Sequence, residues 1–139
     1  MNYDAIYSKA KKVRTIMEQY CINAPYTEGF PPFPKGWCTI ATDVLGAYLQ
    51  KSDPKGNYIY VTGMVGEQSH AWLEYNGYII DITADQFKNM TNQPIIVEKS
   101  NHSLFHQNLE IEEMQPLYTQ DIYKYQPESY LLSKINSNI

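Results

Sequence analysis

The chain has 139 residues and a mass of 16.1 kDa, which suits one domain with a core of its own. Hydrophobic residues make up 43% and charged residues 19%, and the net charge of −4 with a pI near 5.3 argues against a broad nucleic-acid surface. Two cysteines are too few for a disulfide framework, although Cys21 and Cys38 could form a single bond.

The sequence shows neither a recognisable N-terminal signal peptide nor a membrane span. Residues 1–9 lack the apolar core of a signal peptide, and no run approaches the roughly 18 apolar residues of a membrane span. We therefore expect a soluble cytoplasmic protein with no membrane partner. Secretion by a route that is independent of a signal peptide would also be compatible with this sequence.

Two helices are predicted in the first third of the chain, joined by a proline-rich linker. Residues 3–21 place apolar side chains on one stripe, which is typical of an amphipathic helix. Residues 23–35 are rich in Pro, Gly and aromatic residues, and predict an extended connection that could also line one wall of a groove. Apolar residues recur with the helical period from Trp37 to Leu49, so a buried helix of about three turns begins near Trp37.

Cys38 falls in the first turn of this second helix. Unpaired backbone amides and the helix dipole favour a thiolate there. A structural cysteine is expected deeper in the helix, on the apolar stripe, whereas position 38 lies at the edge of that stripe. Free cysteines are more often inert than reactive, so Cys38 becomes a candidate nucleophile only together with residues that follow it in the chain.

The strongest local signal lies at residues 69–83, where two runs of strand-forming residues flank Asn76-Gly77. Asn-Gly is a preferred two-residue loop of β-hairpins, and a further strand is predicted before it at residues 58–65. With this loop, Leu73 opposes Ile80 across the hairpin. Side chains alternate between the faces of a strand, so one face carries four residues of interest: His70, Trp72, Ile79 and Asp81.

His70 and Asp81 are diagonal neighbours in this hairpin, at roughly 7–8 Å between backbone positions, which their side chains can bridge. A carboxylate within reach of an imidazole fixes its tautomer and raises its basicity, which is the orienting half of a catalytic triad. The pair could instead be a polar contact at the end of an exposed hairpin. Taken with Cys38 in the preceding helix, it favours a Cys-His-Asp triad.

The last third of the sequence carries weaker signals. The predicted elements are a turn at 84–87, a short buried strand at 95–97, a polar loop with one helical turn at 100–116, a short helix or strand at 119–132, and a frayed end from 133. His102 and His106 have the spacing of metal ligands on a helix, but no third ligand stands at a matching spacing. We interpret both as surface residues, and predict no metal or cofactor.

Three motifs resemble the papain-like and transglutaminase-like superfamily of cysteine hydrolases: Gly36-Trp37-Cys38, Ser69-His70-Ala71-Trp72-Leu73-Glu74 and Ile80-Asp81-Ile82-Thr83. The resemblance implies an α+β fold, with N-terminal helices packed on an antiparallel sheet in a single catalytic domain over residues 1–139.

The segment 81–87 is most similar to the papain-fold domains of bacterial dermonecrotic toxins and glutamine-deamidating effectors. In those domains a glutamine five residues after the acid is thought to help polarise the amide carbonyl, and Gln86 matches that position. Papain itself carries its oxyanion glutamine six residues before the cysteine, where this chain has Pro32.

The predicted chemistry is amide hydrolysis through a thioester on Cys38, with His70 as the base and Asp81 holding the imidazole. The Cys38 backbone amide and Gln86 would meet the oxyanion, while Trp37 and Trp72 would exclude water or simply pack in the core. The resemblance favours deamidation of a glutamine in a protein or peptide substrate. The alternatives are a cysteine protease, a transglutaminase, and a non-catalytic peptide-binding or adaptor module of the same fold.

Overall fold

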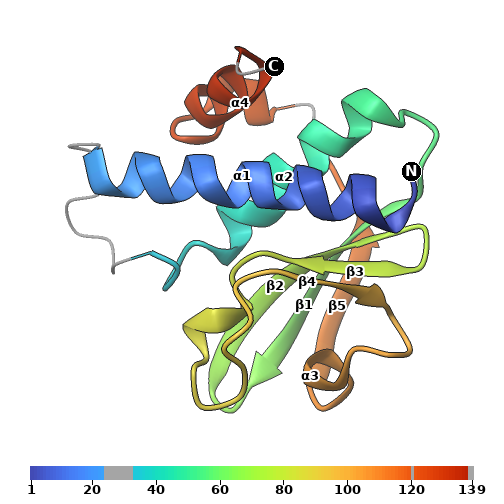
Figure 1. The fold of residues 1–139 in the computed structure, drawn as a ribbon. Coiled ribbons are helices and arrows are strands. Elements are labelled where there is room, and N and C mark those ends of the chain that lie inside the picture. Colours follow the sequence, from blue (N-terminus) through green and yellow to red (C-terminus); the bar gives the residue numbers. More distant parts are fainter. Residues whose placement is uncertain (24–32, 120, 138–139) are drawn as a thin grey trace.

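The computed structural model describes residues 1–23, 33–119 and 121–137. These residues form a mixed α+β fold in which the three longest helices lie on one side of a five-stranded antiparallel sheet (Figure 1). Pro32 and most of the predicted linker lie outside the described residues, so the groove wall assigned to that linker stays a prediction.

The two predicted N-terminal helices are present. They are α1 (Tyr3–Asn23) and α2 (Cys38–Ser52), and a third helix, α4 (Glu128–Ser137), packs against both. The shorter helical segments are η2 (Ala84–Gln86), α3 (Leu104–Gln107) and η3 (Ile122–Lys124).

The sheet has the strand order β4-β3-β2-β1-β5. Its strands are β1 (Tyr58–Val65), β2 (Gln68–Tyr75), β3 (Tyr78–Asp81), β4 (Ile96–Lys99) and β5 (Glu110–Pro116). Every strand pair is antiparallel, and chain neighbours lie side by side except that β5 joins the sheet next to β1.

The hairpin of β2 and β3 has the predicted register, with Leu73 opposite Ile80. Its loop takes a left-handed backbone at both central residues, with φ of 47° at Asn76 and 84° at Gly77. Such a loop matches the twist of the flanking strands and suits Asn and Gly, which explains why two residues fix the pairing of the whole hairpin.

The sheet separates two apolar clusters. The larger lies between the helices and one sheet face, and includes Met17, Trp37, Leu45 and Leu73. The smaller, on the opposite face, contains Val61, Val65, Trp72, Ile79 and Leu109, and is covered by Phe87 and by Phe105 of α3. Asp81 and His70 have the parity of Ile79 and Trp72, so both point to the smaller cluster.

Two expectations for the last third of the chain were wrong. Residues 110–116 form the edge strand β5 rather than a loop, and α4 continues to Ser137 where fraying was expected. All seven residues of β5 are exposed, so pairing with β1 through the backbone, and not burial of a face, holds this strand. Burial of Leu131, Leu132 and Ile135 against the larger cluster holds the end of α4.

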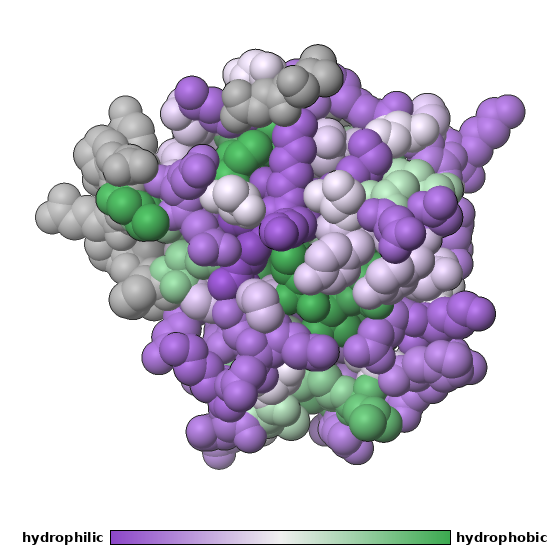
Figure 2. All heavy atoms as spheres, viewed as in Figure 1, coloured by the Kyte–Doolittle hydropathy of each residue, from purple (hydrophilic) through white to green (hydrophobic). Residues whose placement is uncertain are grey.

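The surface is largely polar on the face seen in Figure 2, where hydrophobic residues form only small patches between hydrophilic ones. Among the described residues, none of the helices combines the length and the apolar composition needed to cross a membrane.

Candidate active site

Cys38 and His70 approach one another from opposite faces of the sheet. The helix α2 packs on the face that carries Leu73, whereas His70 points to the face of Trp72. The strand β3 is half as long as β2 and pairs only with residues 73–75. Among the described residues, the first half of β2 therefore has no strand on that side, and the N-terminus of α2 reaches His70 there.

The Cys38 thiol lies at the first residue of α2, as predicted, and it is free, as is Cys21. Burial raises the pKa of the Cys38 thiol, but the hydrogen bond and the charge attraction with His70, helped by the Ala71 backbone N–H, outweigh that effect. The pKa of Cys38 consequently falls below its ordinary value. By contrast, burial raises the pKa of Cys21 to about 11, so the chain contains one activated and one inert thiol.

His70 and Asp81 form a buried pair, with His70 Nε2 2.6 Å from Asp81 Oδ2. Both side chains are at most 1% exposed. Burial lowers the pKa of His70, but the Asp81 charge and hydrogen bonds to Asp81 and Cys38 raise it to about 10. The cost of burying Asp81 is outweighed by His70 and His106, which hold the pKa of Asp81 well below its usual range. The alternative of an exposed hairpin contact is wrong.

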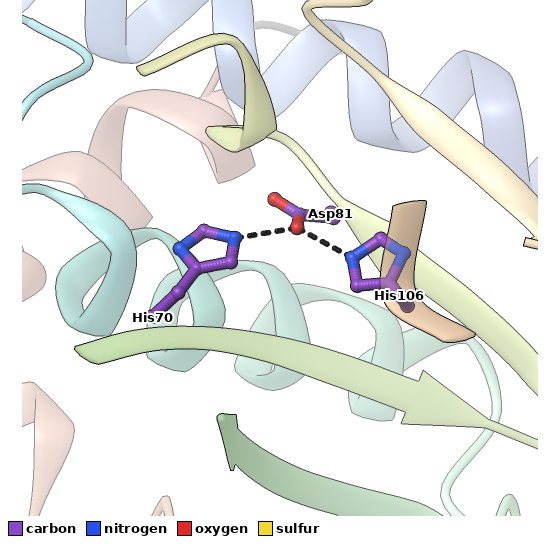
Figure 3. Close-up of side chains that lie close together, drawn as sticks. All are labelled: His70, Asp81 and His106. Carbon is purple, nitrogen blue, oxygen red and sulfur yellow. Dashed lines mark hydrogen bonds and ion pairs between the residues drawn. The ribbon is translucent and has the colours of Figure 1, made fainter. Parts of the chain in front are cut away.

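His106 is part of this site, and its interpretation as a surface residue was wrong. It is 4% exposed, and its Nε2 lies 2.8 Å from the same Asp81 Oδ2 that contacts His70 (Figure 3). Its Nδ1 lies 2.6 Å from Ser103 Oγ, which is also buried. The i, i+4 spacing was misleading because α3 covers only residues 104–107, so His102 is outside the helix and exposed.

His70, Asp81 and His106 are also residues of the kind that bind metals, and their ligand-type atoms lie within 4.8 Å of one another. Ligands around a tetrahedral Zn²⁺ at 2.0–2.2 Å would be roughly 3.3 Å apart. The contacts to Asp81 Oδ2 are shorter, at 2.6 and 2.8 Å, and are those of hydrogen bonds. The arrangement fits a proton-sharing cluster better than a metal centre.

Gln86, at the end of η2, reaches the other side of the His70 ring. Its Nε2 lies 3.0 Å from His70 Nδ1, and its Oε1 accepts the Gly36 backbone N–H at 3.4 Å. The Gly36 donor identifies the oxygen of this amide, so Nε2 is the atom that donates to the imidazole. Gln86, the predicted oxyanion donor, therefore lies beside His70 Nδ1, the ring nitrogen that Asp81 does not occupy.

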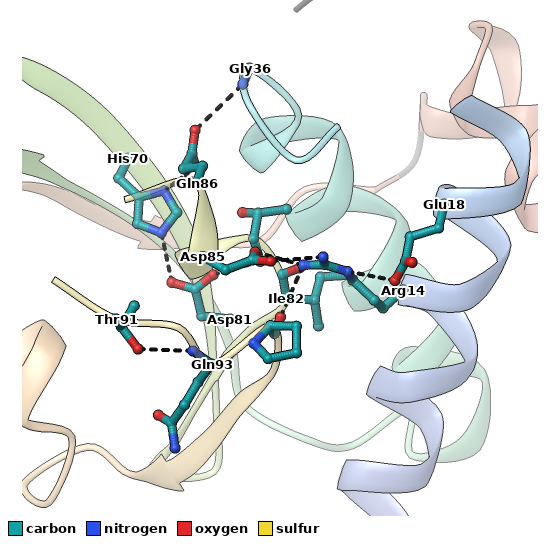
Figure 4. A network of polar contacts seen from close by, with 12 residues as sticks. Arg14, Glu18, Gly36, His70, Asp81, Ile82, Asp85, Gln86, Thr91 and Gln93 are labelled. Carbon is teal, nitrogen blue, oxygen red and sulfur yellow. Dashed lines mark hydrogen bonds and ion pairs between the residues drawn. The ribbon is translucent and has the colours of Figure 1, made fainter. Parts of the chain in front are cut away.

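The segment that carries Gln86 is fixed by Arg14 of α1 (Figure 4). Arg14 is 8% exposed and holds both carboxylate oxygens of Asp85, at 2.7 and 2.9 Å. It also donates to the carbonyl oxygens of Ile82 and Pro94, at 2.8 and 3.2 Å. Nothing in the local sequence around Gln86 indicated this partner, which lies about 70 residues away in the chain.

The two tryptophans differ in position. Trp72 packs against both imidazoles, with ring centroids 5.7 Å from His70 and 4.7 Å from His106, and it is 1% exposed. It therefore keeps water from the Asp81 pair. Trp37 lies in the larger cluster, against Tyr20 and Phe33, where it is a core residue.

A cavity of about 890 Å³ opens at Cys38. Three segments line it: the turn before α2, the turn between β1 and β2, and residues 86–90. Lys35 and Lys88 are its charged lining residues, and Gln68, Ser69 and Asn89 add neutral polar groups. The thiol is thus reachable, whereas Asp81 behind it is not.

A comparison with protein-family models, with curated proteins and with solved structures finds no match to this chain.

Proposed function

We propose that this protein is a cysteine-dependent amide hydrolase of the papain-like and transglutaminase-like type, and that it deamidates glutamine in a protein substrate. The observation that carries the proposal is the order of contacts around His70. One ring nitrogen contacts the buried Asp81 carboxylate at 2.6 Å, while the ring also hydrogen-bonds with a thiol at a helix N-terminus. This order gives a base, its orienting acid and an activated nucleophile.

The reaction begins with transfer of the Cys38 proton to His70. Because Asp81 occupies Nε2, Nδ1 is the nitrogen that accepts the proton. The thiolate then attacks the amide carbon, and His70 returns the proton to the departing nitrogen as ammonia leaves. Water, deprotonated by His70, cleaves the thioester, so that glutamine is converted to glutamate and the Cys38 thiol is restored.

Two donors are available for the oxyanion of the tetrahedral intermediate. The backbone N–H of Cys38 is one of the first amides of α2, which have no carbonyl partner within the helix. Gln86 supplies the second through Nε2. A well-placed donor contributes on the order of 3 kcal/mol to transition-state stabilisation. In this scheme the Gln86 amide moves its hydrogen bond from His70 Nδ1 to the substrate oxygen, which also frees Nδ1 for the proton.

The cavity is large enough for a side-chain amide as the substrate. About 890 Å³ beside Cys38 accommodates a glutamine side chain and parts of its neighbours. Proteases of the papain type spread an extended cleft between two lobes, whereas the described strands after η2 join the same sheet and α4 packs on α1 and α2. Position 86 adds to this argument through its similarity to deamidases.

Intact-mass spectrometry of candidate protein substrates tests the proposal. Wild-type protein is expected to add about one dalton to the substrate and to release ammonia, whereas Cys38→Ala is expected to do neither. Backbone fragments that appear only with the wild type would identify a protease instead. An isopeptide adduct to an added amine would identify a transglutaminase.

Alkylation of Cys38 tests the chemistry without a known substrate. An ordinary thiol with a pKa near 8.5 is almost unreactive towards iodoacetamide at pH 6. Cys38 is expected to react at that pH, and Cys21, with its raised pKa, provides the internal control in the same chain. Equal, slow labelling of both cysteines would leave only the non-catalytic binding module.

A further inference from the structure

We propose that His106 is a positioning residue of the Cys38–His70–Asp81 triad, acting through Asp81 as a second imidazole on the catalytic acid. The inference rests on the proposed function and adds to it a residue that no triad requires. It is carried by three buried contacts: Ser103 Oγ to His106 Nδ1 at 2.6 Å, His106 Nε2 to Asp81 Oδ2 at 2.8 Å, and Asp81 Oδ2 to His70 Nε2 at 2.6 Å.

The hydrogens of this network can be assigned from the charge of Asp81. An ionised carboxylate only accepts, so both imidazoles must present Nε2–H to Oδ2. The remaining oxygen, Oδ1, accepts the Thr83 backbone N–H at 3.0 Å. For His70 the assignment makes Nδ1, which lies beside Gln86 and Cys38, the nitrogen that exchanges a proton with the thiol. For His106 it leaves Nδ1 as the acceptor of the Ser103 hydroxyl, which fixes the tautomer of His106.

A second donor on Oδ2 changes what the acid does to His70. The N–H of His106 offsets part of the Asp81 charge. Asp81 therefore still orients the His70 imidazole but attracts its proton less strongly. The N–H of His106 also fixes the position of Oδ2, since Asp81 is held from two sides as well as by Thr83. Trp72 lies against both rings and excludes water that could replace either contact.

His106 is well supported in this position. It belongs to the single turn α3, and its neighbours Leu104 and Gln107 are exposed, so the turn directs one polar side chain inward. Its ring packs on Phe105 at 4.8 Å between centroids as well as on Trp72. A buried polar group of this kind is costly unless its hydrogen bonds are made, and here both nitrogens have partners.

The test is the pH dependence of Cys38 alkylation in four proteins: wild type, His106→Gln, His106→Asn and His106→Phe. The side-chain nitrogen of Gln superposes on histidine Nε2 and can still donate to Asp81. The Asn side chain is too short to bring its nitrogen to Asp81, and Phe has no donor. Loss of the donor strengthens the hold of Asp81 on the His70 proton. The alkaline limb of the profile is therefore expected to move up by about 0.5–1 pH unit in His106→Asn and His106→Phe, with a roughly three- to tenfold lower plateau rate, while His106→Gln stays near the wild type.

The outcomes separate this inference from the proposed function. If wild-type Cys38 behaves as an ordinary thiol, the triad itself is refuted and the role of His106 with it. If the wild type is activated but the Gln and Asn variants have the same profile, only the positioning role is refuted. A purely structural role would lower the melting temperature of all variants without moving the alkaline limb. Should His106→Phe fail to fold, the comparison of Gln with Asn decides the question.

Discussion

Replacement of Arg14 by alanine tests how the segment between Asp81 and Gln86 is held. Arg14 satisfies both oxygens of Asp85 and two carbonyl groups from a position that is 8% exposed. Removing one partner of a buried ion pair costs about 3–5 kcal/mol. The Asp85 side chain is 15% exposed, so the lower end of that range, about 3 kcal/mol, is expected. The contact with Glu18 adds little, since that side chain is half exposed.

A loss of this size is large beside a total stability of about 5–15 kcal/mol. For a domain of this length it corresponds to a fall in melting temperature of about 10 °C, at roughly 3–4 °C per kcal/mol. Urea and thermal unfolding followed by circular dichroism measure it. Lys11→Ala, an exposed change on the same helix, is the matched control and is expected to stay within about 0.5 kcal/mol of the wild type.

A double variant separates the ion pair from simple packing of the Arg14 side chain. Arg14→Met preserves much of the apolar stem but removes the guanidinium that lies over Phe33, and adding Asp85→Asn removes the charge left without a partner. The double variant is expected to be more stable than Arg14→Met alone by about 1–2 kcal/mol. A loss below about 1 kcal/mol in Arg14→Ala, or no recovery in the double variant, would refute the reasoning.

Three further predictions concern the site. Cys38→Ala and His70→Ala are expected to abolish ammonia release, and Asp81→Asn to lower its rate by a smaller but still large factor through the wrong tautomer; full activity in Cys38→Ala would contradict the triad. The pKa of His70 is raised to about 10, so its contribution to stability is complete below about pH 6.5 and is lost towards pH 10; urea unfolding of the wild type should show this loss, and His70→Gln should remove it. Lys88 lines the cavity, so Lys88→Gln should slow alkylation by iodoacetate about two- to threefold but leave iodoacetamide unaffected, whereas Lys51→Gln should change neither.

The hairpin could be predicted from the sequence because its information is local. Asn76-Gly77 requires a left-handed backbone that few other dipeptides adopt, and this loop fixes the register of β2 against β3. The alternation of faces then brings His70 and Asp81 together without knowledge of any other element. The position of Cys38 at the start of α2 could be predicted for a similar reason, because prolines and a glycine directly before it mark where the helix begins.

The strand β5 could not be predicted in the same way. Neither of its faces is buried, and its apolar residues Ile111 and Met114 are exposed and stand three positions apart, so no two-residue alternation marks an inward side. Backbone hydrogen bonds to β1 hold it, and these leave no trace in side-chain type. The predicted loop over residues 100–116 followed from the expectation that strands show alternating apolar residues. An edge strand that buries neither face does not have to show this alternation.

His106 shows a different limit, because a physical argument for it was available and depended on Asp81. A buried carboxylate has about four acceptor positions, and one imidazole with one backbone amide leaves it short of donors. A further donor on the face of Trp72 therefore had to come from elsewhere in the chain, and the histidines after β4 were among the candidates. The spacing of His102 and His106 indicated a helix that carries both residues. The shortage of hydrogen-bond donors at Asp81 indicated instead that one of the two side chains turns inward.

The length of β3 links these observations to the chemistry. A longer β3 would pair with the first half of β2 and occupy the side on which α2 reaches His70, so the thiol and the imidazole would remain on opposite faces of the sheet. Because the strand ends at Asp81, the chain turns into η2 there and brings Gln86 to the free nitrogen of His70. One strand end thereby supplies the acid, opens the path for the nucleophile and positions the amide donor. Arg14 and His106 hold that strand end from its two sides, which is why substitutions at either are expected to affect the site without touching the thiol.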